Sequence, residues 1–269
     1  MKIEDKEFQT ICRFMLQTYG INLEKKRSLV EGRLSQMVTA NGFSDFRGYT
    51  AAALAQKELQ QQMVTRLTTN FTFFQRESMH YDYMVKQAIP DLLERFPHKG
   101  SLKIWSAGCS SGDEAYTTAI YLREMAFLNG KMPEPIIFAT DISDQALKLA
   151  REASYPEDSL KNIPPTWRKR YFQQAESEKW ELNSEITGSV HFSKQNLMEP
   201  FPANFRNFDL IFCRNVMIYF TSDIRRKLVE KFYAALNPGG YLFIGMSETI
   251  PAAELGFKTV RPSVFVKEG

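Results

Sequence analysis

The residues best placed to do chemistry lie in the stretch Ser106-Ala-Gly-Cys-Ser-Ser-Gly-Asp-Glu114, between two apolar segments. Gly108 and Gly112 let the backbone approach a ligand closely, and the helical spacing that follows predicts free N–H groups at a helix start. Asp113 and Glu114 would repel a pyrophosphate group. The stretch therefore suits a nucleoside cofactor without phosphates, such as S-adenosylmethionine, or else is an ordinary turn whose two acids stabilise a helix start.

A second candidate is Asp141, an acid that ends an apolar run about 29 residues after Gly112. The run, 135–140, is typical of a buried strand. An acid at the end of the second strand of a nucleotide-binding domain can accept hydrogen bonds from ribose hydroxyls. The loop and Asp141 together favour a nucleoside site.

The segment 207–220 carries further polar groups. Its apolar part predicts a buried strand that delivers Cys213, Arg214 and Asn215 to its carboxyl end. Ligands of open α/β sheets bind at this edge. Enzymes that methylate amino groups with S-adenosylmethionine usually carry an Asn/Asp-Pro-Pro-aromatic motif here. This chain has Arg-Asn-Val instead, which disfavours amines and most nucleic-acid bases as methyl acceptors.

The segment Thr69-Asn-Phe-Thr-Phe-Phe-Gln-Arg-Glu77 mixes polar and aromatic residues, which is unusual for a linker between domains. It is interpreted in two ways. It lies over the cofactor cleft as a lid, with Arg76 making a two-pronged contact with a carboxylate. Alternatively, Phe71, Phe73 and Phe74 pack the seam between the domains, and Arg76 and Glu77 form a surface pair.

The elements that must position these groups fall into two parts. Apolar residues recur at helical spacing up to about residue 95, and the later part alternates strand and helix patterns, which predicts a mostly parallel sheet. A polar, turn-rich stretch at about 165–195 predicts a small β insertion with short strands at 180–183 and 190–193. We expect main strands at 102–107, 135–140, 208–213 and 240–245, a turn at 236–240, helices at 114–128, 143–152 and 221–236, and a closing hairpin at 257–260 and 264–267.

Length and composition fit this organisation. The 269 residues, 43% hydrophobic and 24% charged, suffice for a helical domain at 1–75 and an α/β domain at 76–269. A net charge of +3 is too small to indicate a nucleic-acid partner. The charged N-terminus is not a signal peptide, and no apolar run reaches membrane-spanning length. Three cysteines and three histidines lack metal-site spacing. We expect a cytoplasmic protein that is not inserted in a membrane and binds no metal.

Several of these motifs occur in the same order in a known family. They are the segment 69–77, Trp105-Ser-Ala-Gly-Cys-Ser-Ser-Gly-Asp-Glu-Ala-Tyr116, Ala139-Thr-Asp-Ile142, Asn196-Leu197, Phe212-Cys-Arg-Asn-Val-Met-Ile-Tyr-Phe220, and Pro238-Gly-Gly240 through Gly245-x-Ser-Glu248. The chain resembles the chemotaxis receptor glutamate O-methyltransferases (CheR type). The resemblance implies an all-helical N-terminal domain followed by a Rossmann-like, S-adenosylmethionine-dependent methyltransferase domain with a small β insertion.

The resemblance also implies site residues, position by position. Asp141 would bind the ribose of S-adenosylmethionine, and Glu114 would face its charged end. Arg76 would contact the cofactor or orient the acceptor carboxylate, and Tyr219 would either shape the acceptor pocket or be a core aromatic. The implied cofactor-binding set is Asn70, Thr72, Arg76, Gly108, Glu114, Asp141, Asn196, Leu197, Asn215 and Val216. The family's aromatic pair in the linker is shifted by one position in this chain.

The implied reaction transfers a methyl group to a receptor glutamate and yields a methyl ester and S-adenosylhomocysteine. A carboxylate is already ionised at neutral pH and needs no general base. The implied partner is the cytoplasmic helical domain of a chemoreceptor, and we expect the chain to act as a monomer. Lys25, Lys26, Arg27 and Arg33 are either a basic face for this partner or a solvated helix face.

Three other functions remain open at this point. A nucleic-acid methyltransferase of the same fold would need a stronger basic surface. A non-catalytic regulator that binds S-adenosylmethionine or a receptor would not need the motif residues. A nicotinamide dehydrogenase is disfavoured by the acids beside the glycines.

Overall fold

The computed structural model describes residues 1–68, 71–130, 132–175 and 178–268 of the chain. Its N-terminal part is helical, as the spacing predicts, and buries its apolar stripes between the helices. Gly20 ends the first helix with a left-handed φ of 74°, and Asp45 caps the third by accepting the N–H of Gly48 at 2.8 Å. The helices are α1 (Asp5–Tyr19), α2 (Arg27–Ala40), α3 (Phe46–Ala55) and α4 (Lys57–Leu67).

A second helical segment connects this part to the sheet. It consists of α5 (Met79–Tyr83), one turn of π-helix η1 (Met84–Ala88), and α6 (Ile89–Arg95). Tyr81 and Ile89 are buried in the core that these helices share with the sheet. By packing, this segment therefore belongs to the α/β part of the molecule.

A seven-stranded sheet forms the centre of that part, with the strand order β6-β2-β1-β7-β8-β10-β9. The first five strands are parallel, and β10 runs antiparallel to β8, as expected for a closing hairpin. The chain passes from β1 outward to β2 and β6, then returns to β7 on the other side of β1. The order thus reverses between β1 and β7, where α/β sheets bind ligands. The strands are β1 (Ser101–Ala107), β2 (Glu134–Asp141), β6 (Val190–Lys194), β7 (Phe208–Cys213), β8 (Leu236–Ile244), β9 (Phe257–Arg261) and β10 (Val264–Lys267).

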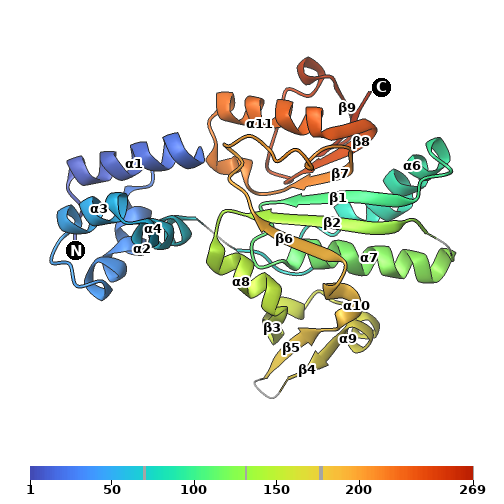
Figure 1. Ribbon diagram of the computed structural model, residues 1–269, viewed down its shortest axis with the longest axis horizontal. Helices are drawn as coiled ribbons and strands as arrows, with labels where there is room; N and C mark the ends of the chain where they lie inside the picture. Colours follow the sequence, from blue (N-terminus) through green and yellow to red (C-terminus); the bar gives the residue numbers. More distant parts are fainter. Residues whose placement is uncertain (69–70, 131, 176–177, 269) are drawn as a thin grey trace.

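Helices cover both faces of the sheet (Figure 1). α7 (Asp113–Asn129) and α8 (Asp144–Glu152) lie on one side, and α11 (Ser222–Ala235) lies on the other. Every residue of β7 is buried, and from Leu210 to Cys213 its side chains alternate between the two cores. Leu210 and Phe212 join the core that contains α7, whereas Ile211 and Cys213 join the core that contains α11.

The β insertion differs from its expected extent. Its three strands pair antiparallel in the order β3-β5-β4 and begin at Ser154, before the expected start. The expected strand at 190–193 is not part of it, because β6 pairs in parallel with β2 at the edge of the main sheet. Pairing with β2 decides this placement, and no local pattern encodes that partner. The insertion contains β3 (Ser154–Pro156), η2 (Glu157–Leu160), α9 (Pro165–Tyr171), β4 (Phe172–Gln174), β5 (Lys179–Leu182) and α10 (Ser184–Thr187).

The start of β8 also corrects an expectation. The residues 236–240, read as a turn, form the irregular beginning of the strand, and the pairing with β7 shifts register between Phe208 and Leu210. The short 3-10 helices η3 (Met217–Tyr219) and η4 (Ala253–Leu255) follow β7 and β8.

The helical part docks onto the carboxyl edge of the sheet. The backbone N–H of Asn22 donates to the carbonyl oxygen of Tyr219 at 2.9 Å, and the amide of Asn196 donates to the carbonyl oxygen of Thr18 at 2.8 Å. Thr65 on α4 contacts Ser143 at 3.2 Å between hydroxyl oxygens. These bonds place α1 and α4 against the loops that follow β2, β6 and β7.

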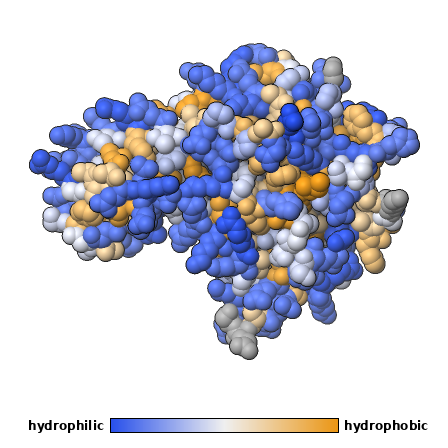
Figure 2. Space-filling model, in the orientation of Figure 1, coloured by the Kyte–Doolittle hydropathy of each residue, from blue (hydrophilic) through white to orange (hydrophobic). Residues whose placement is uncertain are grey.

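The surface is mixed in character. Figure 2 shows hydrophobic residues in small groups among hydrophilic ones on the face in view. Within the described residues, none of the helices combines the length and the apolar composition needed to cross a bilayer.

Candidate active site

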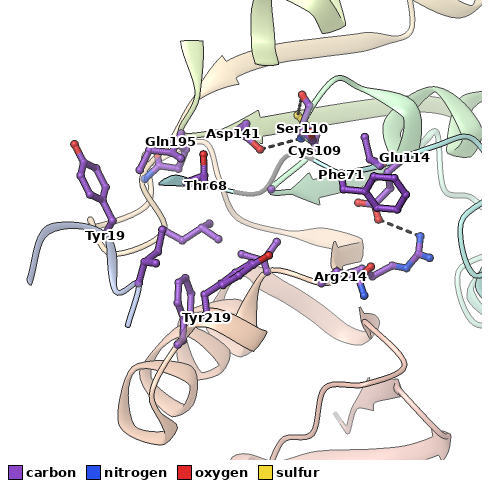
Figure 3. A pocket seen from close by; sticks show the side chains of 18 of the residues that line it. Tyr19, Thr68, Phe71, Cys109, Ser110, Glu114, Asp141, Gln195, Arg214 and Tyr219 are labelled. Carbon is purple, nitrogen blue, oxygen red and sulfur yellow. Dashed lines mark hydrogen bonds and ion pairs between the residues drawn. The ribbon is translucent and has the colours of Figure 1, made fainter. Parts of the chain in front are cut away.

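A pocket opens at the carboxyl edge of the sheet, where the strand order reverses. It contains about 1030 Å³ of atom-free space, part of it open to solvent. Helical domain, linker and sheet loops all contribute to its wall (Figure 3). Of the predicted site residues, Asn70 lies outside the described part of the chain, and all the others line this pocket: Thr72, Arg76, Gly108, Glu114, Asp141, Asn196, Leu197, Asn215, Val216 and Tyr219.

Gly108 brings two walls of the pocket together. It follows β1 with a φ of 86°, and a Cβ there would lie 2.4 Å from Cγ2 of Val216, after β7. Only glycine permits this conformation and this approach without strain. The glycine loop is thus held directly against the loop that carries Asn215.

Asp141 organises the loops after β1 and β2. Its carboxylate accepts the backbone N–H of Ser110 at 2.8 Å and that of Ser143 at 2.9 Å. Burial raises the pKa of Asp141, and these hydrogen bonds oppose the rise. Asp141 therefore supplies a fixed acceptor at the pocket wall, as its position at a strand end predicts.

Arg214 is the centre of a buried ionic cluster. Its side chain is 1% exposed and lies 3.2 Å from Oε2 of Glu77 and 3.1 Å from Oε2 of Glu114. It also donates to the hydroxyl of Tyr81 at 2.9 Å and to the carbonyl oxygen of Arg76. One cation thereby joins the linker, α5, α7 and β7. Figure 3 shows the contact between Glu114 and Arg214.

The two carboxylates of this cluster respond differently to it. Burial raises the pKa of Glu114. The ion pair with Arg214 and the hydrogen bond from the Ser106 hydroxyl, at 2.6 Å, lower the pKa by less, so the net shift is upward. At Glu77 burial also opposes ionisation, but Arg214 and the Asn215 amide outweigh it and hold the pKa below its usual value. The expected surface pair of Arg76 and Glu77 is wrong, because Glu77 pairs with Arg214.

Glu248 fixes the loop that carries Asn215. Its carboxylate accepts backbone N–H groups from Asn215 at 3.1 Å, Ile218 at 3.0 Å and Gly245 at 2.6 Å. The side-chain amide of Asn215 in turn donates to Glu77 at 3.2 Å. The loops after β7 and β8 therefore form one rigid wall.

The linker residues fall into two groups, one buried in the α/β part and one at the pocket. Phe74 is fully buried, but it packs against Tyr155 and Phe172 of the insertion and not at the seam between the helical and α/β parts. Phe71 and Arg76, by contrast, line the pocket, and Nη1 of Arg76 donates to the carbonyl oxygen of Phe71 at 2.8 Å. The linker thus forms one wall of the pocket.

Asn196 and Tyr219 line the pocket while also holding the helical domain. The amide of Asn196 donates to the carbonyl oxygen of Thr18, its side-chain oxygen accepts the N–H of Met198 at 3.0 Å, and its carbonyl oxygen accepts the N–H of Glu199 at 3.0 Å, so Asn196 is held firmly in the wall. Tyr219 is half-buried in η3, and its backbone binds Asn22.

The helical domain adds residues that the sequence did not indicate. Tyr19 and Ile21, at the end of α1, line the pocket beside Asn196 and Tyr219. No local motif marks them, because their role depends on domain docking. Gln195 was also missed, although it precedes a motif residue.

The expected basic face is only partly available. Arg27 pairs with Asp5, and Arg33 donates to the carbonyl oxygens of Leu67 at 3.0 Å and Thr68 at 3.2 Å. Lys25 and Lys26 are exposed. The arginines thus serve contacts within the helical domain. Over the described ranges, no cluster of three potential metal-binding side chains occurs.

His80 is a buried neutral group behind the cluster, and it predicts a pH effect. Its Nε2 lies 2.8 Å from the Ser263 hydroxyl, and its Nδ1 lies 3.5 Å from Oε2 of Glu77. Burial, with Arg214 and Arg261, lowers its pKa to about 4 against the pull of Glu77. The unfolded chain therefore binds more protons between pH 4 and 6.5, so stability falls as the pH falls through this window.

We expect His80→Gln to remove this dependence. The difference in unfolding free energy between wild type and variant should grow by up to about 3 kcal/mol from pH 4 to 6.5, measured by urea denaturation. His191→Gln, at an exposed position, is the matched control and should leave the profile as in wild type. An unchanged profile for the His80 variant would contradict a neutral buried His80.

Comparison with known proteins gives concordant matches. Residues 6–68 match the family model "CheR methyltransferase, all-alpha domain", and residues 70–266 match "CheR methyltransferase, SAM binding domain". The chain is 40% identical over 256 residues to the chemotaxis protein methyltransferase of Borreliella burgdorferi, covering 93% of this chain and 90% of that one. It is 34% identical over 272 residues to chemotaxis protein methyltransferase 1 of Vibrio cholerae, covering 98% of both.

Proposed function

The chain belongs to the CheR methyltransferase family and carries its S-adenosylmethionine-binding domain, and from this premise we propose that it methylates glutamate side chains of chemoreceptors. The products are glutamyl methyl esters and S-adenosylhomocysteine. The observation that carries the proposal is the gathering of every described candidate residue around one pocket at the switch point of the sheet.

The charges of the pocket support S-adenosylmethionine as the ligand. Two acids, Glu114 and Asp141, and two arginines, Arg76 and Arg214, line the pocket, and Arg214 is paired with Glu114 and, outside the lining, with Glu77. S-adenosylmethionine carries a sulfonium, an ammonium and a carboxylate, and so has one net positive charge. The two acids can face the sulfonium and the ammonium, and an arginine can face the carboxylate, so the lining complements this ligand.

We assign roles to the wall residues accordingly. Asp141 accepts from the ribose hydroxyls, and Glu114 faces the ammonium group. Asn196 and Leu197 border the cofactor on the side of the helical domain, and their carbonyl oxygens already accept from Gln195 and Lys231. Asn215 and Val216 border the methyl group from the end of β7, with Thr72 on the linker.

The methyl donor supplies an electrophilic carbon on a sulfonium. The protein positions the acceptor carboxylate against this carbon and keeps water out of the pocket. The acceptor carboxylate needs no base, because it is ionised. Attraction between carboxylate and sulfonium strengthens when water is excluded, and Phe71, Ile21 and Val216 are apolar walls that exclude it. Arg76 orients the carboxylate or holds the cofactor, and Tyr219 shapes the acceptor pocket. Alignment with the S–CH₃ bond contributes up to about 7–11 kcal/mol in ideal cases.

A two-part experiment tests the proposed function. Calorimetry should show binding of S-adenosylmethionine and S-adenosylhomocysteine. Incubation with labelled S-adenosylmethionine and receptor-containing membranes should give base-labile label that is released as methanol. Binding without transfer would favour a non-catalytic regulator, and label on added RNA alone would favour a nucleic-acid methyltransferase.

The partner, the oligomeric state and the compartment follow from the same premise. We propose that a monomer acts in the cytoplasm on the helical cytoplasmic domain of the receptor, with Lys25 and Lys26 contributing attraction to its acids. Reversing both charges should slow methylation at low salt and have less effect at high salt. Sedimentation of the purified protein tests the monomer.

Asp141→Asn should weaken binding of S-adenosylmethionine about 10- to 100-fold, because a hydrogen bond to a charged acceptor contributes about 1.5–3 kcal/mol. Calorimetry measures this directly. Asp144→Asn is the matched control, because Asp144 is an exposed acid three residues away that pairs with Lys194. Equal affinity of wild type and Asp141→Asn would remove Asp141 from the site.

A further inference from the structure

We propose that three exposed apolar side chains at the mouth of the pocket, Phe71, Ile218 and Met246, form a docking surface for the receptor helix that carries the acceptor glutamate. We call this surface the apolar rim. The inference rests on the proposed function. It adds which side chains of the receptor helix, next to the acceptor glutamate, the protein recognises. The rim takes a helix that presents an apolar side chain within one turn of that glutamate.

The three side chains are exposed to solvent. Phe71 is 67% exposed, Ile218 47% and Met246 53%. Single exposed apolar residues are common on protein surfaces. These three differ because they lie on loops that border one functional site, and apolar groups around a site are typical of an interaction surface.

The loops that carry the rim residues border the pocket. Phe71 lines it, and Ile218 stands in η3 beside Tyr219, which also lines it. Met246 follows Gly245, which touches Asn215 so closely that a Cβ there would lie 2.7 Å from the Asn215 amide nitrogen. The rim thus joins the linker, the loop after β7 and the loop after β8. In Figure 3, Phe71 lies beside the ion pair of Glu114 and Arg214.

The backbone under each rim residue is fixed. Glu248 accepts the N–H of Ile218 at 3.0 Å, and Glu77 accepts the N–H of Met246 at 3.3 Å. The carbonyl oxygen of Phe71 accepts from Arg76 at 2.8 Å. A backbone that is already ordered loses little entropy when a partner binds, which favours affinity.

The charges near the rim define the partner. Glu77 and Glu248 lie directly behind it, with their oxygens occupied by Arg214, Asn215 and backbone N–H groups. A uniformly acidic helix face would gain nothing from the apolar side chains in front of them. One carboxylate, by contrast, can reach Arg76 and the sulfonium inside the pocket. The rim therefore fits a helix face with one acid and apolar neighbours.

Helix geometry supplies the spacing. Residues three or four positions apart lie on the same face of a helix. When the acceptor carboxylate enters the pocket, the residues at these positions lie at its mouth. An apolar side chain there would be buried against Ile218 and Met246.

Two matched acceptor peptides test the inference. Both are soluble helical peptides with one glutamate and differ only in having leucine or glutamine three and four positions away. Wild type should methylate the leucine peptide with a KM at least about tenfold lower. The double variant Ile218→Ser/Met246→Ser should lose this preference and keep the wild-type affinity for S-adenosylmethionine. A double variant with Phe127→Ser and Leu128→Ser is the control, because these residues are 72% and 76% exposed at the end of α7.

The outcomes separate this inference from the function on which it rests. Transfer by wild type to both peptides with equal KM would overturn the rim and leave the proposed function intact. Absence of transfer to either peptide and to receptor membranes would overturn the proposed function, and the rim with it. A wild-type dimer that the Ile218/Met246 double variant converts to a monomer would assign the rim to self-association and also overturn the inference.

Discussion

Replacing Arg214 by methionine is expected to destabilise the protein by about 3–5 kcal/mol, because it leaves buried carboxylates without a counter-charge. Arg214 is 1% exposed, and both Glu77 and Glu114 depend on it. Single domains are stable by about 5–15 kcal/mol, so the variant should unfold at much lower urea concentration and lose binding of S-adenosylmethionine. Urea denaturation followed by circular dichroism measures the loss.

A second variant makes this prediction specific to the uncompensated charges. Adding Glu77→Gln and Glu114→Gln to Arg214→Met removes those charges and should recover part of the stability, because a buried ion cluster replaced as a whole costs much less than a broken one. Arg226→Met is the matched control, because its partners Glu230 and Glu254 are exposed and the pairs contribute little. A wild-type unfolding midpoint for Arg214→Met would contradict the assigned role.

Replacing Arg76 by alanine is expected to lower methyl transfer about 10²- to 10³-fold while the protein stays folded, a range typical for removal of one charge-stabilising donor from an active site. Its guanidinium donates to the Phe71 carbonyl and lines the pocket, so its removal buries no unpaired charge. Arg76→Lys should give an intermediate rate, because lysine keeps the charge but cannot make a two-pronged contact.

Kinetic constants distinguish the two roles of Arg76. Weaker binding of S-adenosylmethionine would identify a cofactor contact, whereas a higher KM for the receptor would identify an acceptor contact. Lys161→Ala is the control, because Lys161 is a neighbouring cation beside the Phe73 ring that does not line the pocket. Turnover of Arg76→Ala equal to that of wild type would remove Arg76 from the mechanism.

Most residues of the site were predictable because they lie at the carboxyl ends of buried strands. The glycine loop, Asp141 and the Arg-Asn-Val segment each end a buried strand, and the carboxyl ends of parallel strands meet at one edge. Local apolar spacing therefore predicted both the elements and the edge on which their polar residues gather. The resemblance to a known family added Thr72, Asn196 and Leu197, which no periodicity marks.

The order of the strands and the ionic cluster depend on contacts between residues that are far apart in the sequence. The sequence predicted the strand at 190–193 but not its partner, because a short strand pairs wherever a sheet edge is free, and here that edge is β2. The docking of Tyr19 and Ile21 at the pocket likewise follows from contacts between domains.

Short-range patterns in the sequence thus determined the two-part fold, the strand ends and the charge type of the site. Only the tertiary structure decided that Arg214 unites them, because its hydrogen-bond partners Glu114, Tyr81 and Glu77 lie 100, 133 and 137 residues away along the chain. Hydrophobic periodicity reports which face of an element is buried, and it carries no information on which distant charge a buried arginine will meet. That choice is made when the linker and α7 close over the end of β7, where an unpaired charge would be too costly to bury.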